Sequence, residues 1–349
     1  DGVCVGGELK ASIAVVRGGR VVLSQHLGDL GDPLALAAFR DAIDDMIRLF
    51  DVTPTWIACD RHPTYLSAAH ARRLASRWKL PVFDVQHHHA HAASVLAEHG
   101  KVGPALAIVC DGVGFGEDGA SWGGELLRID GPRFDRIAHL PALPLIGGDA
   151  AAVDVRRTGL AMLRQALGGD FAGHPVARQM VPDDAEREMF RRMIDRRINC
   201  PPTTAAGRVF DGVAAILGLA DRNTFEAEAP MRLEAHAADV PMHPPIADTP
   251  ALDTSPLIRR LLLDIEHAAP VCESAARFHD AFVDLWVARV RDAARQHGLD
   301  TIALTGGVFC NARLTRRIVQ RLTDVGLRVL RHELVPANDG GLALGQAAV

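Results

Sequence analysis

This chain of 349 residues has few aromatic residues and no excess of positive charge. Aromatic side chains make up 5% of it, Tyr65 is its single tyrosine, and the formal net charge is −5 at pH 7. Proteins that bind single-stranded nucleic acid stack the bases on aromatic side chains and attract the backbone with positive charge. Since both features are weak here, nucleic acid is not an expected partner.

Long apolar runs and paired cysteines are also missing. No uninterrupted apolar stretch reaches the length of a transmembrane helix and no signal-peptide pattern is present, so we expect a cytoplasmic protein without a membrane partner. The six cysteines are scattered with no CxxC pair, which excludes a zinc finger and favours buried thiols in a reducing compartment. The chain begins at Asp1 rather than at methionine and runs almost directly into an expected strand, which favours a segment of a longer polypeptide.

The length of the chain and its 48% hydrophobic residues give room for two lobes, each with a core of its own. Alternating strand and helix patterns in residues 1–104 predict a first α/β lobe in the order ββαβαβα. The expected elements are a hairpin of residues 10–16 and 21–25, a helix over 34–50, a strand over 56–60, a helix over 66–80 and a strand over 81–85 that leads into a last helix.

Residues 105–349 predict a second α/β lobe, which also opens with two strands joined by a glycine-rich turn, at 105–110 and 121–129. This echo between the halves is weak evidence by itself, but a duplicated nucleotide-binding lobe would show it. A helical insertion is expected at about 132–274. Within it we expect helices near 154–167, 183–198 and 207–219 and a proline-rich surface loop at 240–256. A helix over 274–297, strands near 301–304 and 327–330 and a helix over 311–325 complete this lobe.

Four histidines stand within residues 87–91, where the expected strand 81–85 meets a helix. His87 and His91 are four residues apart, so on a helix their imidazoles project from one face and can share a metal ion. Open α/β sheets bind ligands beyond the carboxyl ends of their strands, which favours a site. The alternative is a polar helix start whose histidines only cap the helix or meet solvent. Two histidines supply only part of a metal shell, so other ligands must come from elsewhere in the chain.

A glycine-rich turn follows the expected strand 105–110 and begins with Asp111, Gly112 and Gly114. Glycines let backbone N–H groups approach a phosphate, while an aspartate at the strand end can bind a metal or orient water. The acidic residues of this turn would repel a bare phosphate, so a bound cation such as Mg²⁺ strengthens this interpretation. A tight hairpin turn is the alternative.

Two further glycine turns stand near the C-terminus. Gly306 and Gly307 precede a helix that begins at Asn311, and the free N–H groups of such a helix favour a nucleotide phosphate or ribose. A glycine turn that merely starts a helix is equally compatible. Asp339 stands on the last turn and would complete a shell of two histidines and one carboxylate with His87 and His91. An Asx turn alone also explains this aspartate.

Ordered motifs along nearly the whole chain resemble one family. They are GGELKASIAV, ACDRHPTYLS, VQHHHAHAASV, CDGVGFGEDGASWGGE, LPLIGGDAA, GRVFDGVAA, TGGVFCNARL and VPANDGGLALGQ. In this order they are similar to the carbamoyl-transfer module of HypF-type hydrogenase maturation proteins. The module is also similar to the threonylcarbamoyl transferases that modify tRNA and to antibiotic O-carbamoyltransferases. Full-length HypF-type proteins carry in addition an acylphosphatase-like domain, CxxC zinc fingers and a domain that makes carbamoyl adenylate, and no such pattern occurs here.

The resemblance implies the fold of actin and the heat-shock chaperone ATPases, in which two α/β lobes enclose a nucleotide. It implies an iron or zinc ion held by residues that match His87, His91 and Asp339, with Asp111 as a further ligand and catalytic group. Lys10 is the second expected catalytic residue, and Arg156 or Arg157 is a candidate for added positive charge. The ATP or AMP moiety is expected beside Gly112, Gly114, Gly207, Asp211, Glu226, Gly306, Gly307 and Asn311.

The activity implied by the resemblance is transfer of a carbamoyl group from carbamoyl adenylate to the C-terminal cysteine of the partner protein HypE. The resulting thiocarbamate is a precursor of the cyanide ligands of nickel–iron hydrogenase. The chain would depend on an adenylate-forming domain for its substrate. Two alternatives stay open: an O-carbamoyl or tRNA threonylcarbamoyl transferase, and a nucleotide-regulated assembly module that binds a maturation partner without performing transfer.

Overall fold

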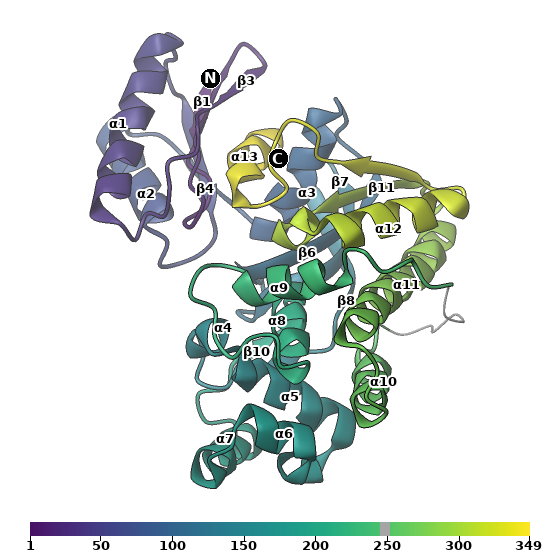
Figure 1. Ribbon diagram of the computed structural model, residues 1–349. Coiled ribbons are helices and arrows are strands. Elements are labelled where there is room, and N and C mark those ends of the chain that lie inside the picture. The colour runs from purple at the N-terminus through teal and green to yellow at the C-terminus, as the bar shows by residue number, and fades with distance from the viewer. Residues whose placement is uncertain (245–251) are drawn as a thin grey trace.

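Two mixed β-sheets with helices packed on them form the computed structural model, which describes residues 1–244 and 252–349 (Figure 1). The first sheet has the strand order β3-β2-β1-β4-β5. Its strands β1, β2 and β3 form an antiparallel meander, and β4 and β5 run parallel to β1. The strands are β1 Gly2–Cys4, β2 Ala14–Arg17, β3 Arg20–Leu23, β4 Trp56–Asp60 and β5 Val82–Val85.

The second sheet repeats this arrangement. Strands β6, β7 and β8 form an antiparallel meander, and β11 and β12 continue in parallel on the other side of β6. The short strands β9 and β10 extend the sheet beside β7. The strands are β6 Ala105–Phe115, β7 Ser121–Asp130, β8 Arg133–His139, β9 Leu143–Pro144, β10 Pro202–Thr203, β11 Thr301–Thr305 and β12 Arg328–Arg331. The common strand order explains why both halves of the sequence open with a hairpin, and the two-lobed α/β fold that was expected is confirmed.

The helices outside the insertion position the two sheets. Helices α1 and α2 pack on one face of the first sheet, where Phe39 and Ile43 join Ile13 and Ile57 in the core. Helix α12 begins at an asparagine cap, because the Asn311 side chain accepts the N–H of Leu314. The helices are α1 Pro33–Leu49, α2 Leu66–Trp78, α3 His87–Glu98, α12 Ala312–Asp324 and α13 Leu342–Ala348.

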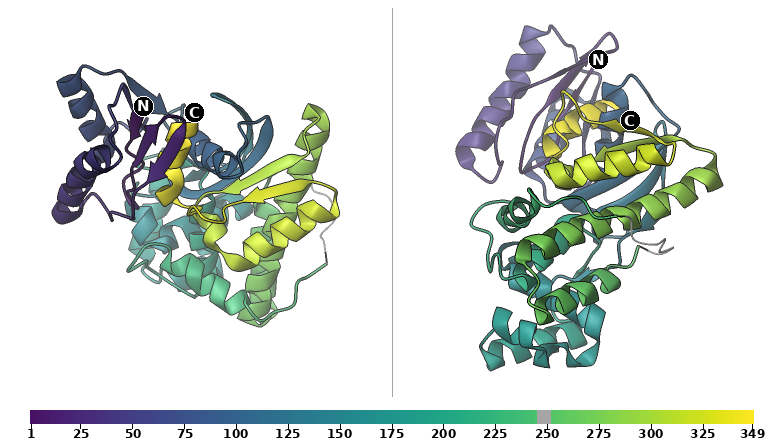
Figure 2. Two further views of the ribbon diagram at one scale, coloured as in Figure 1. Left: turned by 90° about the horizontal axis from the view of Figure 1, so that it is seen from above. Right: turned by 45° about the vertical axis from the view of Figure 1, so that its right-hand side comes forward.

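The last helix of each half packs against the sheet of the other half. Helix α3 follows the first sheet, yet its Leu96 is buried with Ala107 of the second sheet. Helix α13 follows the second sheet, yet its Leu342 is buried with Cys4 of the first, and Figure 2 shows this helix beside the N-terminal strands. The two helices touch, since a Cβ at Gly345 would lie 1.8 Å from the Ala90 carbonyl oxygen. The first turns of α3 and α13 therefore meet between the lobes.

A helical insertion occupies the chain between β8 and β11, drawn in teal and green in Figure 1. Its helices are α4 Ala150–Val153, α5 Val155–Leu167, α6 Pro175–Met180, α7 Asp184–Arg196, α8 Ala206–Ile216, α9 Glu228–Ala237, α10 Ser255–Glu266 and α11 Val271–His297. Aromatic side chains from two of these helices, Phe210 of α8 and Phe278 and Phe282 of α11, pack edge to face or tilted against one another in the core.

The sequence patterns missed several elements of this region, among them β8, α6, α9 and α10. Strand β8 is a half-exposed edge strand rich in charge, so its apolar pattern is weak. Helix α9 also escaped notice, and α10 begins at Ser255, inside the stretch 240–256 that was expected to be a loop. Pro256 occupies the first turn of α10, where a missing N–H costs nothing, so this proline starts a helix. Residues 245–251 of the expected loop lie outside the described residues.

The expected division of the chain at residue 104 falls in the connection between α3 and β6. Because α3 packs on the second sheet, the lobes share helices, and the division into lobes of residues 1–104 and 105–349 stays a prediction. No helix within residues 1–244 and 252–349 combines the length and the apolar content needed to cross a bilayer.

Candidate metal centre and the cavity beside it

Four side chains from three distant segments converge between the lobes. His87 and His91 stand on the first turns of α3, Asp111 lies in β6, and Asp339 begins a short 3₁₀ turn before α13. One ligand atom of each residue lies within 4.8 Å of the ligand atoms of the others. The two histidines are fully buried and Asp111 nearly so, while Asp339 is slightly exposed. The structure thus brings together the four residues that were predicted as metal ligands.

Local geometry aims these side chains at one point. Helix α3 starts where it does because the Gln86 side chain accepts the N–H of His89 and caps the first turn. The pairing of β6 with β7 is interrupted between Cys110 and Gly114, which lets Asp111 leave the regular ladder. Asn338 caps the final turn by accepting the N–H of Gly340 at 3.1 Å.

Asp60, at the end of β4, sets the orientation of His87. Its Oδ2 lies 2.7 Å from His87 Nδ1, and its Oδ1 accepts the N–H of His62 at 2.8 Å. A carboxylate only accepts, so His87 Nδ1 carries the proton and its Nε2 is directed to Asp111 at 3.4 Å and Asp339 at 3.7 Å. Sequence reasoning missed Asp60, although an acidic residue at the end of a buried strand was a usable signal.

The electrostatics of this cluster favour a cation. Burial alone would lower the pKa of His87, yet the charge of Asp60 and the contact with Asp111 raise it well above its usual value. Burial alone would raise the pKa of Asp111, yet His87 and His91 hold it well below its usual range. Imidazole nitrogens that face two buried carboxylates need a positive charge between them, which a proton or a metal ion supplies.

The donor set fits a transition metal. His91 Nε2 is buried without a hydrogen-bond partner and lies 3.4 Å from Asp339 and 3.5 Å from Asp111. Two imidazole nitrogens and two carboxylate oxygens suit iron or zinc, and the carboxylate behind His87 is the usual outer partner of such a ligand. Mg²⁺ prefers oxygen ligands alone, so these four residues match it poorly. Ligation by His87, His91, Asp111 and Asp339 remains a prediction.

The other two histidines of the stretch do not join the cluster. His88 Nδ1 lies 3.1 Å from the side-chain nitrogen of Gln86, and His89 Nε2 lies 3.2 Å from the carbonyl oxygen of Gly131. Both rings pack between α3 and the neighbouring strands, His88 beside Trp122 and His89 beside Phe134.

Glu98 ties the far end of α3 to the segment that leads to Asp339. One of its carboxylate oxygens accepts the backbone N–H groups of residues 333–335, two of them at 3.1 and 3.2 Å. Its other oxygen lies 3.1 Å from His332 Nδ1. Burial raises the pKa of Glu98, but these N–H groups outweigh burial and lower it. The helix that carries both histidines is therefore anchored to the chain that carries the second carboxylate.

A cavity of about 350 Å³ opens beside the cluster, between the first lobe, the end of β6 and the insertion. Asp111 and Asp339 line its inner end, and Glu226 adds a third carboxylate. Arg208 is the single positively charged residue among the described residues that line it. Exposed apolar side chains, among them Leu9, Val113 and Phe225, surround it.

The glycines predicted to bind a nucleotide have different surroundings. A Cβ at Gly112 would meet no atom within 4 Å, so this backbone is open to the cavity. A Cβ at Gly114 would lie 2.6 Å or less from the His87 and His88 rings, and a Cβ at Gly207 would lie 2.9 Å from the Cα of Gly112. Gly114 and Gly207 are therefore needed for close packing around the cluster.

The second glycine turn is tied to the cluster. Gly306 has a φ of +99°, and a Cβ there would lie 2.2 Å from the Cys110 carbonyl oxygen. The N–H of Gly307 donates to Asp111 Oδ1 at 2.9 Å, which holds the carboxylate in place. The side chain of Asn311 caps α12 through its oxygen, and its nitrogen lies 3.0 Å from His279.

Charged residues named from the sequence mostly have partners within the protein. Lys10 of the first lobe forms an ion pair with Glu226 of the insertion, which joins a residue predicted to be catalytic to one predicted to bind adenosine. Asp211 is fully buried and accepts the Asn223 amide at 3.1 Å. Arg156 and Arg157 both bind Asp154, at 2.8 and 3.1 Å, and neither lines the cavity.

Comparison with known proteins shows which family the chain belongs to. A family model described as a Kae1-like carbamoyltransferase domain, second subdomain, matches residues 107–346, and a model of the HypF Kae1-like domain matches residues 1–98. The fold is thus that of a Kae1-like carbamoyltransferase domain. The chain belongs to the HypF carbamoyltransferase family.

Individual relatives agree with this family. The chain is 39% identical to a carbamoyltransferase HypF of Rhodobacter capsulatus, over 99% of this chain and 46% of that protein. It is 38% identical to a carbamoyltransferase HypF homolog of Cupriavidus necator, over 99% of this chain and 90% of that protein. The chain thus spans about half the length of the Rhodobacter protein.

Solved structures of the family have the same fold. A full-length HypF, crystallised in a phosphate- and nucleotide-bound form, matches all of this chain and 55% of its own length with a TM-score of 0.91 and 32% identity. The HypF of T. kodakarensis matches 99% of this chain and 46% of its own length with a TM-score of 0.89 and 30% identity.

Proposed function

We propose that this chain is the module of a HypF-type protein that moves a carbamoyl group from carbamoyl adenylate to the C-terminal cysteine of a HypE-like partner. The single observation that carries the proposal is the cluster of two histidines and two aspartates at the inner end of the cavity between the lobes. Family membership supports carbamoyl transfer, and the cavity supports a reaction beside the cluster. The chain would depend on a separate adenylate-forming domain for its substrate.

The protein's own residues would prepare the site for this transfer. His87, His91, Asp111 and Asp339 would hold an iron or zinc ion, which when bound supplies Lewis-acid stabilisation of oxygen charge. Asp60 holds His87 in one tautomer, and the N–H of Gly307 holds Asp111. Groups that are fixed before the substrate arrives need no reorganisation during the reaction.

The transfer itself is an acyl exchange. The acceptor reacts as a thiolate whose proton has passed to water. A carbon–sulfur bond forms at the carbamoyl carbon, the bond from that carbon to the phosphate oxygen breaks, and the bonding electrons leave with AMP. The apolar rim of Leu9, Val113 and Phe225 would limit the access of competing water once both substrates are in the cavity.

Intact-mass analysis of the HypE-like partner tests this proposal. The partner is incubated with this chain, ATP, carbamoyl phosphate and the adenylate-forming domain, and we expect the partner to gain one carbamoyl group. The double variant His87→Ala/His91→Ala should be at least about 100-fold slower, because loss of inner ligands exceeds the roughly 10- to 100-fold that an outer partner costs. The same variant should lose its bound iron or zinc in elemental analysis.

His99→Ala is the matched control, because His99 stands just after α3 and bonds to the Arg331 carbonyl, away from the cluster. It should keep both metal and transfer. No mass gain in the partner, with nucleotide and partner still bound, would overturn the proposal in favour of a nucleotide-regulated assembly module.

A further inference from the structure

Arg208 stands in the first turn of α8 and lines the cavity beside the cluster. Its Nε is buried without a hydrogen-bond partner. Its Nη2 forms an ion pair with Asp211 Oδ2 at 2.8 Å, but the angles of this contact do not make a hydrogen bond. Asp211 Oδ2 is therefore also without a hydrogen-bond partner. The charge of the guanidinium is therefore paired, while its N–H groups are left with bonding capacity.

The partner of Arg208 is a buried carboxyl group. Asp211 is fully buried, and burial raises the pKa of its carboxyl group. A buried ion pair gains little stability, because the desolvation of two charges offsets their attraction. Asp211 is itself held by the Asn223 amide at 3.1 Å, so the pair is fixed at the wall of the cavity. This arrangement favours a binding role for the guanidinium over a stabilising one.

The charges around the cavity show where an anion can bind. Asp111, Asp339 and Glu226 are the acidic residues of its described lining, and Arg208 is the single cationic side chain there. Lys10 is engaged in an ion pair with Glu226, one of the residues that line the cavity. An anionic group in this cavity thus has one protein side chain that attracts it.

We propose that Arg208 binds the phosphate group of the carbamoyl donor and holds it as AMP leaves. This inference rests on the proposed function. A guanidinium presents a planar fork of N–H donors that matches two phosphate oxygens at once. As the bond between carbamoyl carbon and phosphate oxygen breaks, negative charge grows on the phosphate, and Arg208 would stabilise it more strongly then than before.

Calorimetric binding of AMP, adenosine and orthophosphate to the protein as purified tests the inference. Arg208→Gln should weaken AMP binding by about 10- to 100-fold, the range expected for loss of hydrogen bonds to a charged group. Adenosine, which has no phosphate, should bind both proteins equally. Arg208→Lys should fall between them, because lysine keeps the charge but not the fork. Orthophosphate shows whether the site takes a free phosphate or only a nucleotide.

Arg277→Gln is the matched control. Arg277 also pairs with a buried aspartate, Asp264, at 2.5 Å, but it lies on α11 at a different cavity. It should leave AMP binding unchanged. Equal losses of AMP and adenosine in Arg208→Gln, or unchanged AMP binding in a variant that melts like the wild type, would overturn the inference.

The inference and the proposed function fail in different ways. If the wild type carbamoylates the partner and Arg208→Gln does so with the same KM and kcat, the role of Arg208 is wrong and the function stands. If the wild type carbamoylates nothing, yet Arg208→Gln weakens the binding of AMP and not that of adenosine, the function is wrong and the phosphate site stands.

Discussion

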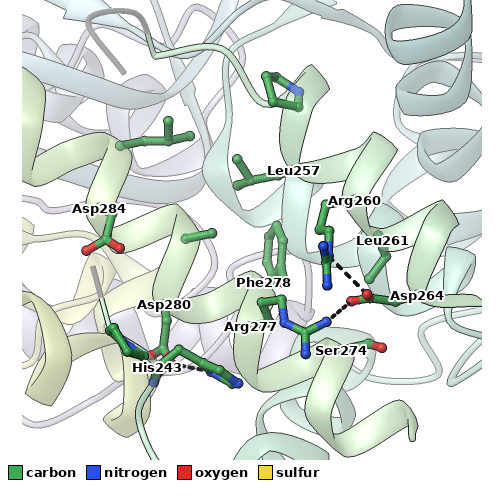
Figure 3. A pocket seen from close by; sticks show the side chains of 14 residues that line it. His243, Leu257, Arg260, Leu261, Asp264, Ser274, Arg277, Phe278, Asp280 and Asp284 are labelled. Atoms are coloured by element: carbon green, nitrogen blue, oxygen red, sulfur yellow. Dashed lines mark hydrogen bonds and ion pairs between the residues drawn. The ribbon is translucent and has the colours of Figure 1, made fainter. Parts of the chain in front are cut away.

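Two cavities of this protein differ in how their charges are satisfied. The larger, about 470 Å³, lies between α10 and α11 and is lined by Leu257, Leu261 and Phe278 among others (Figure 3). Its carboxylates have arginine partners: Asp264 binds two arginines, and Asp280 binds Arg313 at 3.0 Å. The smaller cavity, about 350 Å³, is lined by Asp111 and Asp339, whose ion-pair partners are histidines, while its third carboxylate, Glu226, pairs with Lys10.

This difference in charge, rather than the volume of the cavities, favours the smaller one as the functional site. An apolar cavity with paired charges is stable without a ligand. Buried imidazole nitrogens directed at carboxylates are costly until a cation joins them. We therefore expect the smaller cavity to be the one that takes a ligand, and variants at both cavities test this expectation.

Among residues outside the four predicted ligands, the largest effect on zinc binding is expected from Asp60→Asn, at the outer edge of the cluster. The amide no longer requires His87 to carry its proton on Nδ1, so Nε2 is no longer held free for a metal. We expect zinc affinity to fall by about 10- to 100-fold, the usual cost of losing an outer partner. Competition with a chromogenic zinc chelator measures this.

Asp84→Asn is the control for Asp60→Asn. Asp84 lies on the neighbouring strand β5, is about half exposed and binds Arg72 at 2.7 Å. It should keep the wild-type zinc affinity. If Asp60→Asn also kept it, the cluster would not be a metal site of the proposed kind.

A smaller effect is expected from Glu98→Gln, which weakens the anchor of the segment before Asp339. Neutral glutamine accepts the three N–H groups less strongly, so zinc affinity should fall several-fold and the free energy of unfolding by about 1–3 kcal/mol at pH 7. Zinc competition and urea unfolding measure the two quantities.

The pH dependence of this difference gives a separate check. The folded-state pKa of Glu98 is lowered, so its charge stabilises the fold above the ordinary pKa of about 4.3 and this stabilisation is lost as pH falls through the folded value. The gap in unfolding free energy between wild type and Glu98→Gln should be constant from pH 7 to 5 and shrink below that. A gap that widens in acid would contradict the anchor.

The smallest effect is expected at the larger cavity. Arg260 is mostly exposed and pairs with Asp264 at 3.1 Å, and Asp264 keeps Arg277 when Arg260 is changed. Arg260→Gln should therefore lower the free energy of unfolding by less than about 1 kcal/mol and leave AMP binding and carbamoyl transfer unchanged. Loss of transfer in this stably folded variant would show that the larger cavity takes part in function.

Much of the first lobe was predictable because its signals are local. The strand Trp56–Asp60 has the expected bounds, and α1 and α2 lie within two residues of theirs. The histidine pair was predictable because a spacing of four residues on a helix places both rings on one face. The insertion was harder, since β8 is a polar edge strand and α10 starts with a proline.

The glycines show the limit of this approach. Gly114 and Gly306 were expected beside a nucleotide, which stays a prediction, and the structure shows that they also pack closely against histidine rings and the Cys110 carbonyl. A glycine that admits a phosphate and a glycine that admits a neighbouring ring have the same sequence signal, because both only require the absence of Cβ.

Local pattern and ordered motifs thus sufficed for the α/β class, the family and the pairing of His87 with His91. Tertiary structure alone decided that Asp60 stands behind His87, that Glu98 anchors the segment before Asp339, and that Arg208 lines the cavity with unused donors. The physical reason is distance along the chain. Periodicity reports which face of its own helix or strand a residue occupies. Contacts between distant segments depend instead on how the last helix of each half packs against the sheet of the other half.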